Sequence, residues 1–434
     1  MKQTKLVTAL LVVLMLGGWT AAFLDDESEG EAEYEAHLDK AEDYMERGLY
    51  QKAIQEYDSA LAVKNSENVW ADKLEAYDRR YEEDSEIYNA YLEAAGTAVD
   101  MFGENEDYVM TLANLYIERE EYPSAYEVLN DAIENGVESE KIDRLIMNVK
   151  YSYEVGWQSY TGYRTCTEGL YPVCNLDGWI YIEKDGTETE GDPLLMAGPV
   201  GESGIRVVLD QERGYLIDTD NVVQGILDFE PVDAGVYSEG LVPISNGKSF
   251  SYYNSLGDKK FGDYVRAGTF TDGEAAVQQG TKWFLIDDNG ERISDESYDD
   301  IILYTDGSHI KNGVMIAKKD GSYKFYKDGK TIGDYSDADI ITGDEMVAVC
   351  KNGKWGYVDL DGNELIPPTY EEAKSFSNGL AAVSDGELWG FINKDGTLVI
   401  DYTFFGADYF NSEKCCMVET GKDTTWQMIS LYVK

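Results

Sequence analysis

One short phrase recurs along residues 174–434 of this chain, and it constrains the fold more than any other feature. Its clearest copy, KWGYVDLDG, spans Lys354–Gly362, and a near-copy, LWGFINKDG, spans Leu388–Gly396. The position of the tryptophan falls, copy by copy, on Trp179, Gly214, Phe250, Trp283, Tyr323, Trp355, Trp389 and Trp426. A period of about 35 residues is typical of small structural units that stack and share one core.

A second landmark follows the first at a constant offset, so the repeat does not arise from chance similarity. It reads FSNGLAAV at Phe376–Val383, and earlier forms lie at Tyr237–Ile244 and Phe270–Val277. Aromatic and β-branched residues fill each unit, and Asp-Gly or Asn-Gly pairs close its tight turns. Roughly three to four short strands per unit make one propeller blade or one coil of a β-solenoid.

The number of copies favours a closed ring. Seven intervals and an eighth, truncated copy at Trp426–Val433 predict a seven-bladed β-propeller. In this prediction the truncated copy adds a strand to the first blade and so removes exposed sheet edges. An open β-solenoid is the alternative.

These residues resemble a known family. Trp355-Gly356-Tyr357, the Asp361-Gly362 turn, Ile366-Pro367-Pro368 and the Phe376–Val383 segment together are similar to the WG-repeat (KWG-repeat) family of bacterial proteins. The resemblance covers about residues 174–434, is strongest in the units that begin at Trp355 and Trp389, and loosens toward the first unit. It implies a β-repeat surface module whose ligand is largely unknown, and it brings no chemistry with it.

Residues 35–140 follow a different pattern, rich in Ala, Glu and Tyr, with helical periodicity. Small and aromatic residues recur at matching offsets in two segments: Ala41, Tyr44, Gly48, Tyr50, Ala53, Tyr57 and Ala60, then Ala113, Tyr116, Tyr122, Ala125, Leu129 and Ala132. This pattern is similar to the tetratricopeptide (TPR) repeat, and a third, degenerate copy fits between Trp70 and Val99. Three such repeats build a concave groove for a peptide, with Tyr57 expected in its lining. A helical hairpin array without peptide binding is the alternative.

The remaining segments give the chain its organisation. Two lysines precede an uncharged run at Leu6–Leu24, and acidic residues follow at once. Residues 1–24 are therefore predicted to be a cleaved signal peptide or an uncleaved membrane anchor, and both place the rest of the chain outside the cytoplasm. Residues 25–34 read as an acidic linker, residues 141–173 as a capping helix and linker, and residues 174–434 as the WG-repeat β-domain.

The charge of the chain limits its partners. With 84 acidic and 36 basic residues the net charge is −48. Such a surface repels nucleic acid and anionic lipid, so we set nucleic-acid binding aside. A protein or peptide partner is expected, with a cell-wall glycan as the alternative, and weak binding of divalent cations is compatible with this charge.

The sequence offers no catalytic, cofactor-binding or metal-ligating constellation. His37 and His309 are the two histidines of the chain; neither has a plausible catalytic nucleophile near it in sequence, and His309 is expected in a solvated loop. A carboxylate-based hydrolase is the less favoured alternative, because acidic residues are abundant but no pair stands out.

Three further groups of residues have a structural interpretation. The strings Asp359–Asn363 and Asp218–Asn221 resemble calcium loops but read better as turns. Cys415 and Cys416 are expected to be buried in a strand, while Cys166 and Cys174 could form a disulfide bond. The repeating aromatic residues are expected to pack between units, which leaves non-repeating ones as candidates for stacking on a sugar: Tyr252, Tyr253, Tyr304, Phe404 and Phe405.

Together these features predict a non-enzymatic, extracytoplasmic binding or adaptor protein. Its TPR-like groove would hold one partner and its β-repeat surface another. The alternative is a lectin-like surface protein that binds cell-wall glycan through the β-domain.

Overall fold

The computed structural model describes residues 27–422 and 424–434, and the chain divides after Val149 into two compact units. The predicted signal peptide or anchor, residues 1–24, lies outside the described residues. Among the helices that are described, none is both long and apolar enough to cross a membrane.

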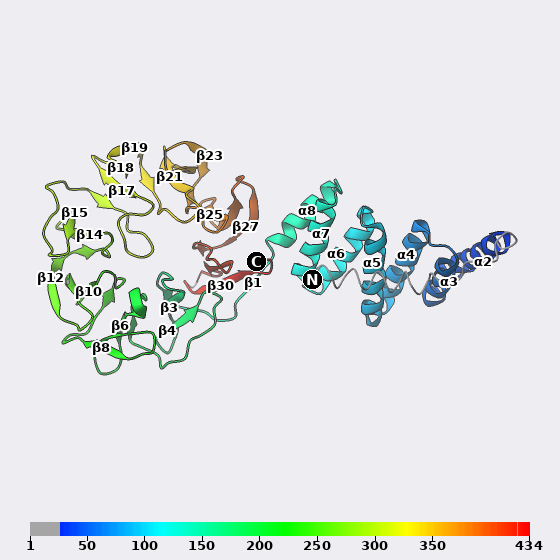
Figure 1. Cartoon of the computed structure of the whole chain (residues 1–434), viewed down its shortest axis with the longest axis horizontal. Coiled ribbons are helices and arrows are strands. Elements are labelled where there is room, and N and C mark those ends of the chain that lie inside the picture. Colours follow the sequence, from blue (N-terminus) through cyan, green and yellow to red (C-terminus); the bar gives the residue numbers. More distant parts are fainter. Residues whose placement is uncertain (1–26, 423) are drawn as a thin grey trace. The chain divides into compact units, whose positions relative to one another are not determined.

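The N-terminal unit is helical, as its periodicity predicts. Within the described residues it has seven α-helices: α2 (Glu27–Glu46), α3 (Tyr50–Val63), α4 (Glu67–Glu83), α5 (Tyr88–Phe102), α6 (Glu106–Glu118), α7 (Tyr122–Glu134) and α8 (Glu140–Lys150), with a 3₁₀ turn η1 (Ser85–Ile87) before α5. Their order is consistent with TPR-like hairpins, and Figure 1 shows the helices in succession. Because α2 begins at Glu27, most of the segment expected to be an acidic linker is helical.

Alanines allow these helices to pack closely. Ala41, Ala53 and Ala60 are fully buried in the first hairpin, and Ala113 and Ala125 take the same role in the third. A small side chain at such a position lets two helix backbones approach, while tyrosine and leucine fill the space beside it.

Tyr57 belongs to this packing and not to a groove. Its side chain is only 3% exposed and lies in a cluster formed by α2, α3 and α4. The expectation that Tyr57 lines a binding groove is therefore wrong; the offset of Tyr57 in the pattern marks a core position.

The C-terminal unit is a β-propeller (Figure 1). Its sheets are antiparallel and follow one another along the chain, and we call them blades I to VIII. Their strands are β2 (Gly162–Tyr163), β3 (Leu170–Cys174) and β4 (Trp179–Glu183) in I; β5 (Met196–Ala197), β6 (Arg206–Leu209), β7 (Gly214–Ile217) and β8 (Val223–Ile226) in II; β9 (Asp233–Ala234), β10 (Val242–Ser245), β11 (Phe250–Tyr253) and β12 (Lys259–Tyr264) in III; and β13 (Arg266–Ala267), β14 (Glu274–Gln279) and β15 (Lys282–Asp287) in IV.

The second half of the ring continues in the same way. Its strands are β16 (Asp300–Ile301), β17 (Val314–Lys319), β18 (Ser322–Lys327) and β19 (Lys330–Tyr335) in V; β20 (Asp337–Ala338), β21 (Val347–Lys351), β22 (Lys354–Val358) and β23 (Glu364–Tyr370) in VI; β24 (Glu372–Ala373), β25 (Leu380–Ser384), β26 (Trp389–Asn393) and β27 (Leu398–Phe404) in VII; and β28 (Gly406–Ala407), β29 (Cys415–Glu419), β30 (Trp426–Leu431) and β1 (Tyr153–Val155) in VIII.

The described residues thus form eight blades, and the predicted number of seven is wrong. The last copy of the repeat is a full blade, because β28, β29 and β30 pair with one another and take their fourth strand from β1. The N-terminal part of the unit closes blade VIII, whereas we expected the C-terminal part to close blade I. Strands β1, β2 and most of β3 come from residues 141–173, where a capping helix and linker were predicted.

Close contact between backbones explains the glycine of the Trp-Gly pair in blades VI and VII. A Cβ atom on Gly356 would lie 2.6 Å from the carbonyl oxygen of Ile366, and one on Gly390 would lie 2.6 Å from the carbonyl oxygen of Ile400. The last strand of each blade, β23 in VI and β27 in VII, is bulged at this point and passes close to the glycine. A side chain would collide with the neighbouring backbone, so only glycine allows this approach.

The aromatic residue two positions after the tryptophan joins neighbouring blades. Tyr357 is fully buried, and its hydroxyl donates to the carbonyl oxygen of Lys374, 3.0 Å away. Lys374 directly follows β24, the first strand of the next blade and the one nearest the centre of the ring. Tyr181 and Tyr252 donate in the same way to Gly198 and Gly268, at 2.7 and 2.8 Å. Tyr252 therefore occupies a position of the repeat, and the expectation that it lies outside the repeat is wrong. The recurring aromatic residues therefore pack between units, as expected.

Candidate functional site

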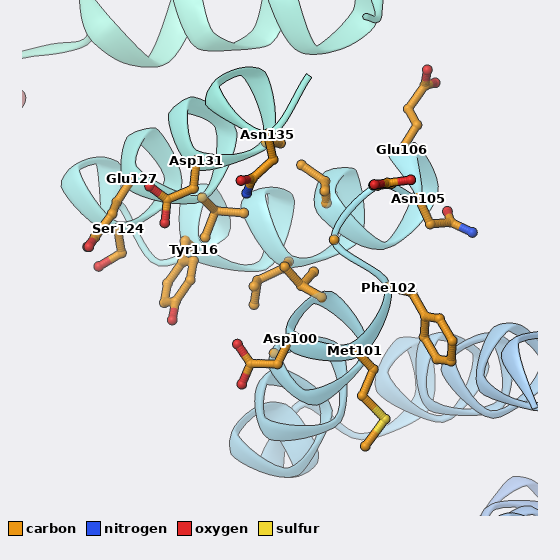
Figure 2. A pocket seen from close by; sticks show the side chains of 18 of the residues that line it. Asp100, Met101, Phe102, Asn105, Glu106, Tyr116, Ser124, Glu127, Asp131 and Asn135 are labelled. Atoms are coloured by element: carbon orange, nitrogen blue, oxygen red, sulfur yellow. The ribbon is translucent and has the colours of Figure 1, made fainter. Parts of the chain in front are cut away.

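The helical unit has a groove between α5, α6 and α7. It encloses about 1180 Å³. Figure 2 shows side chains from these helices around its opening, among them Asp100, Tyr116 and Asp131. The inward-facing positions of each helix supply an apolar floor: Val99, Val109, Leu112, Val128 and Ala132.

The rim of this groove is acidic. Six carboxylate residues line the pocket, with no lysine, arginine or histidine among its lining residues: Glu67, Asp100, Glu104, Glu106, Glu127 and Asp131. Glu106 is paired with Lys141 at 2.6 Å, and Glu67 accepts a hydrogen bond from Asn105 at 2.9 Å. The other four have no side-chain hydrogen bond or ion pair in the part of the chain that the structure describes.

In this groove, solvent-exposed carboxylates without partners lie beside an apolar floor. Burial and the nearby acidic residues Glu121 and Glu127 raise the pKa of Tyr116, which also lines the groove. Because carboxylates line the groove and basic residues do not, the local potential is negative. The sequence pattern predicted a concave groove in this unit but not its acidic rim, because the carboxylates come from four helices and a loop and are inconspicuous in so acidic a chain.

The two histidines have different surroundings. Nδ1 of His37 lies 2.6 Å from a carboxylate oxygen of Glu56. His309 is only 2% exposed, so the prediction that it is solvated is wrong. Burial lowers the pKa of His309 to about 4, which keeps its ring neutral at pH 7.

Most residues that we expected to stack on a sugar are buried. Tyr252, Tyr253, Tyr304 and Phe404 are all less than 9% exposed. Phe405 alone of the five is partly exposed, with the ammonium group of Lys422 5.7 Å from its ring centroid. The four buried side chains pack the blades and are not available as an aromatic platform.

The calcium-like strings form turns. One carboxylate oxygen of Asp359 accepts hydrogen bonds from the backbone amides of Asp361 and Asn363, at 2.9 and 2.8 Å, and Asp218 does the same for Asp220 and Val222. This is the Asx-turn arrangement, which accounts for the spacing. Among residues 27–422 and 424–434, no group of three or more His, Cys, Asp or Glu side chains is close enough to hold a metal ion.

The described cysteines are free thiols, including Cys166 and Cys174. Cys415 and Cys416 are buried in β29, as expected for small apolar side chains. Because neighbouring strand residues point to opposite faces, Cys415 packs toward blade I and Cys416 toward blade VII.

Fold and groove together define a two-part repeat protein, helical hairpins followed by a β-propeller. A family model described as "WG containing repeat" matches residues 355–389 and 389–422, so blades VI to VIII include WG repeats. No curated protein matches the chain.

Several solved structures are similar in fold. The crystal structure of a eukaryotic initiation factor is 10% identical, with a match over 65% of this chain and 88% of that one and a TM-score of 0.42. The Pan2 WD40 domain of Neurospora crassa has 11% identity, coverages of 63% and 90%, and a TM-score of 0.35. The Sgt2 TPR domain of Aspergillus fumigatus has 21% identity, coverages of 27% and 77%, and a TM-score of 0.22. These scores are too low to support an inference about function.

Proposed function

We propose that this protein is a non-enzymatic binding or adaptor protein that acts outside the cytoplasm, and that its helical groove holds a basic, partly apolar segment of another protein. The observation that carries the proposal is the set of unpaired carboxylates around an apolar floor. A lysine- or arginine-containing segment would neutralise the rim while its apolar side chains cover the floor.

Charge supports this choice of partner. The chain carries a net charge of −48, so an acidic segment would be repelled both at the groove and over the whole surface. The leader predicted at residues 1–24 supports a place outside the cytoplasm. Glycan binding by aromatic platforms is the weaker candidate, because four of the five side chains expected to form them are buried.

Binding of three peptides of equal length to the full chain tests the proposal. Their sequences alternate leucine with lysine, serine or glutamate. We expect the lysine peptide to bind, the serine peptide to bind weakly and the glutamate peptide not to bind, and we expect affinity for the lysine peptide to fall as salt is added.

Matched variants locate the site. Asp100→Asn combined with Asp131→Asn should weaken binding of the lysine peptide, whereas Glu33→Gln combined with Glu35→Gln, two exposed positions on α2, should not. Equal binding of all three peptides, or equal loss in both double variants, would overturn the proposal.

A further inference from the structure

The inner strands of the propeller enclose a second cavity, of about 720 Å³. Its lining includes residues on the first strand of a blade or within two residues after it, from every blade, so it lies at the centre of the ring: Tyr163, Arg164, Pro199, Asp233, Arg266, Leu303, Ile340, Lys374, Asp408 and Tyr409. A cavity of this size falls in the usual range for a small-molecule site.

The charge of this cavity differs from that of the protein. Three basic side chains line it, Arg164, Arg266 and Lys374, together with two carboxylates, Asp233 and Asp408. A third carboxylate, that of Asp339, lies behind the lining with its oxygens 2.7 and 2.8 Å from the hydroxyl of Tyr409. In a chain with a net charge of −48, this local balance of acidic and basic side chains departs from the overall excess of acid. The basic residues stand on blades I, IV and VII and so are spread around the ring.

Two of the three cations are engaged in pairs that tie blades together. Nζ of Lys374 donates to Asp408 at 2.9 Å, and the hydroxyl of Tyr163 donates to the other oxygen of the same carboxylate at 2.7 Å. Arg164 donates to Asp233 through Nη1. These contacts join blades I, III, VII and VIII, so a structural role accounts for Arg164 and Lys374.

The third cation has no such role. Arg266 lies on the inner strand β13 with its side chain exposed to the cavity, and it has no hydrogen bond or ion pair in the described part of the chain. Arg266 is therefore the basic side chain of the described lining that is free to pair with a ligand.

We infer that the central cavity binds a small hydroxylated carboxylate of the size and kind of a sugar acid. The carboxylate of the ligand accepts from the guanidinium of Arg266, which is suited to planar, two-pronged recognition. The hydroxyl groups of the ligand meet a lining of tyrosine hydroxyls and carboxylates, which both accept hydrogen bonds. This site belongs to the β-unit and is independent of the helical groove.

Calorimetric titration of the full chain with glucuronate tests the inference. Glucose, which lacks the charge, and acetate, which lacks the hydroxyl groups, serve as comparisons. We expect glucuronate to bind more tightly than either. Failure of glucuronate to bind, or binding of glucose with equal affinity, overturns the inference.

Three variants tie the binding to this cavity. Arg266→Gln should lower the association constant for glucuronate about tenfold, since a charge-assisted hydrogen bond is lost. Arg213→Gln, an exposed arginine in the turn between β6 and β7, should leave it unchanged. Unchanged affinity in Arg266→Gln overturns the inference. The groove variant Asp100→Asn with Asp131→Asn should bind glucuronate normally, so failure of one proposal is distinguishable from failure of the other.

Discussion

Tyr153 lies directly opposite Leu431 in an antiparallel strand pair, so the first strand of the β-unit completes the last blade. The ring of Tyr153 also packs on Phe404 of blade VII, with 5.7 Å between the ring centroids. Tyr151 and Tyr153 both contact the apolar cluster that joins blades VII and VIII. Closure therefore contributes apolar burial as well as backbone pairing, and it removes the free edge of β30.

Two truncations measure how much pairing with β1 stabilises the propeller. Removing residues 1–149 leaves β1 in place, whereas removing residues 1–158 deletes it together with Tyr151. We expect the shorter protein to melt several degrees lower and to self-associate as concentration rises, because β30 then has unpaired backbone groups. Calorimetry and sedimentation compare the two. Identical melting and monomeric behaviour would show that β1 is dispensable.

The hydroxyl of Tyr357 provides a second test. In Tyr357→Phe the carbonyl oxygen of Lys374 loses its donor while it stays in the core between blades VI and VII. We expect the free energy of unfolding to fall by about 1 kcal/mol, and by up to about 3 kcal/mol if the carbonyl stays unpaired. Urea unfolding gives the value. Tyr215→Phe, at a partly exposed tyrosine whose hydroxyl has no described contact, is the control and should change stability little.

The Trp-Gly pair leads to a third prediction. Gly390→Ala places a methyl group 2.6 Å from the backbone oxygen of Ile400, and backbone cannot move aside as a flexible side chain can. We expect a loss of about 1–3 kcal/mol, the usual cost of overpacking. Gly343→Ala is the matched control, because a Cβ atom there meets nothing within 4 Å. Equal stability of the two variants in urea would remove this explanation of the motif.

The repeat period predicted much of the fold. It identified a β-repeat unit with aromatic packing between copies, and the alanine and tyrosine offsets identified the helical hairpins. It could not predict the number of blades. When the copies are counted by their tryptophan position, the last one, at Trp426, looks incomplete. Nothing in the sequence around Tyr153–Val155 shows that these three residues complete that blade.

The candidate sites were less accessible to sequence reasoning. The rim of the groove combines Asp100 with Asp131, and the cavity combines Arg266 with Lys374, residues that only the fold brings to one place. No local spacing encodes such groups. His309 shows the same limit, since a histidine after an Asp-Gly turn reads as solvated until the packing around it is known.

The burial of His309 makes the stability of the β-unit depend on pH. Its pKa is lowered from 6.5 to about 4 in the folded protein, chiefly by burial; Asp272 acts in the opposite direction, and a carboxylate oxygen of Glu274 lies 3.8 Å from Nε2. The unfolded chain therefore takes up this proton first as the pH falls. Above pH 6.5 the ring is neutral in both states, and the free energy of unfolding keeps its full value. As the pH falls from 6.5 toward 4, protonation of the unfolded chain lowers the free energy of unfolding by a total of roughly 3 kcal/mol.

A variant without the titrating ring isolates this effect from that of the many carboxylates. We expect His309→Gln to flatten the pH dependence of β-unit stability between pH 6.5 and about 4, measured by urea unfolding at a series of pH values. His37→Gln, in the helical unit, should leave that dependence unchanged. If the wild-type protein and His309→Gln lose stability in parallel over this range, the carboxylates alone account for the acid sensitivity and the histidine has no part in it.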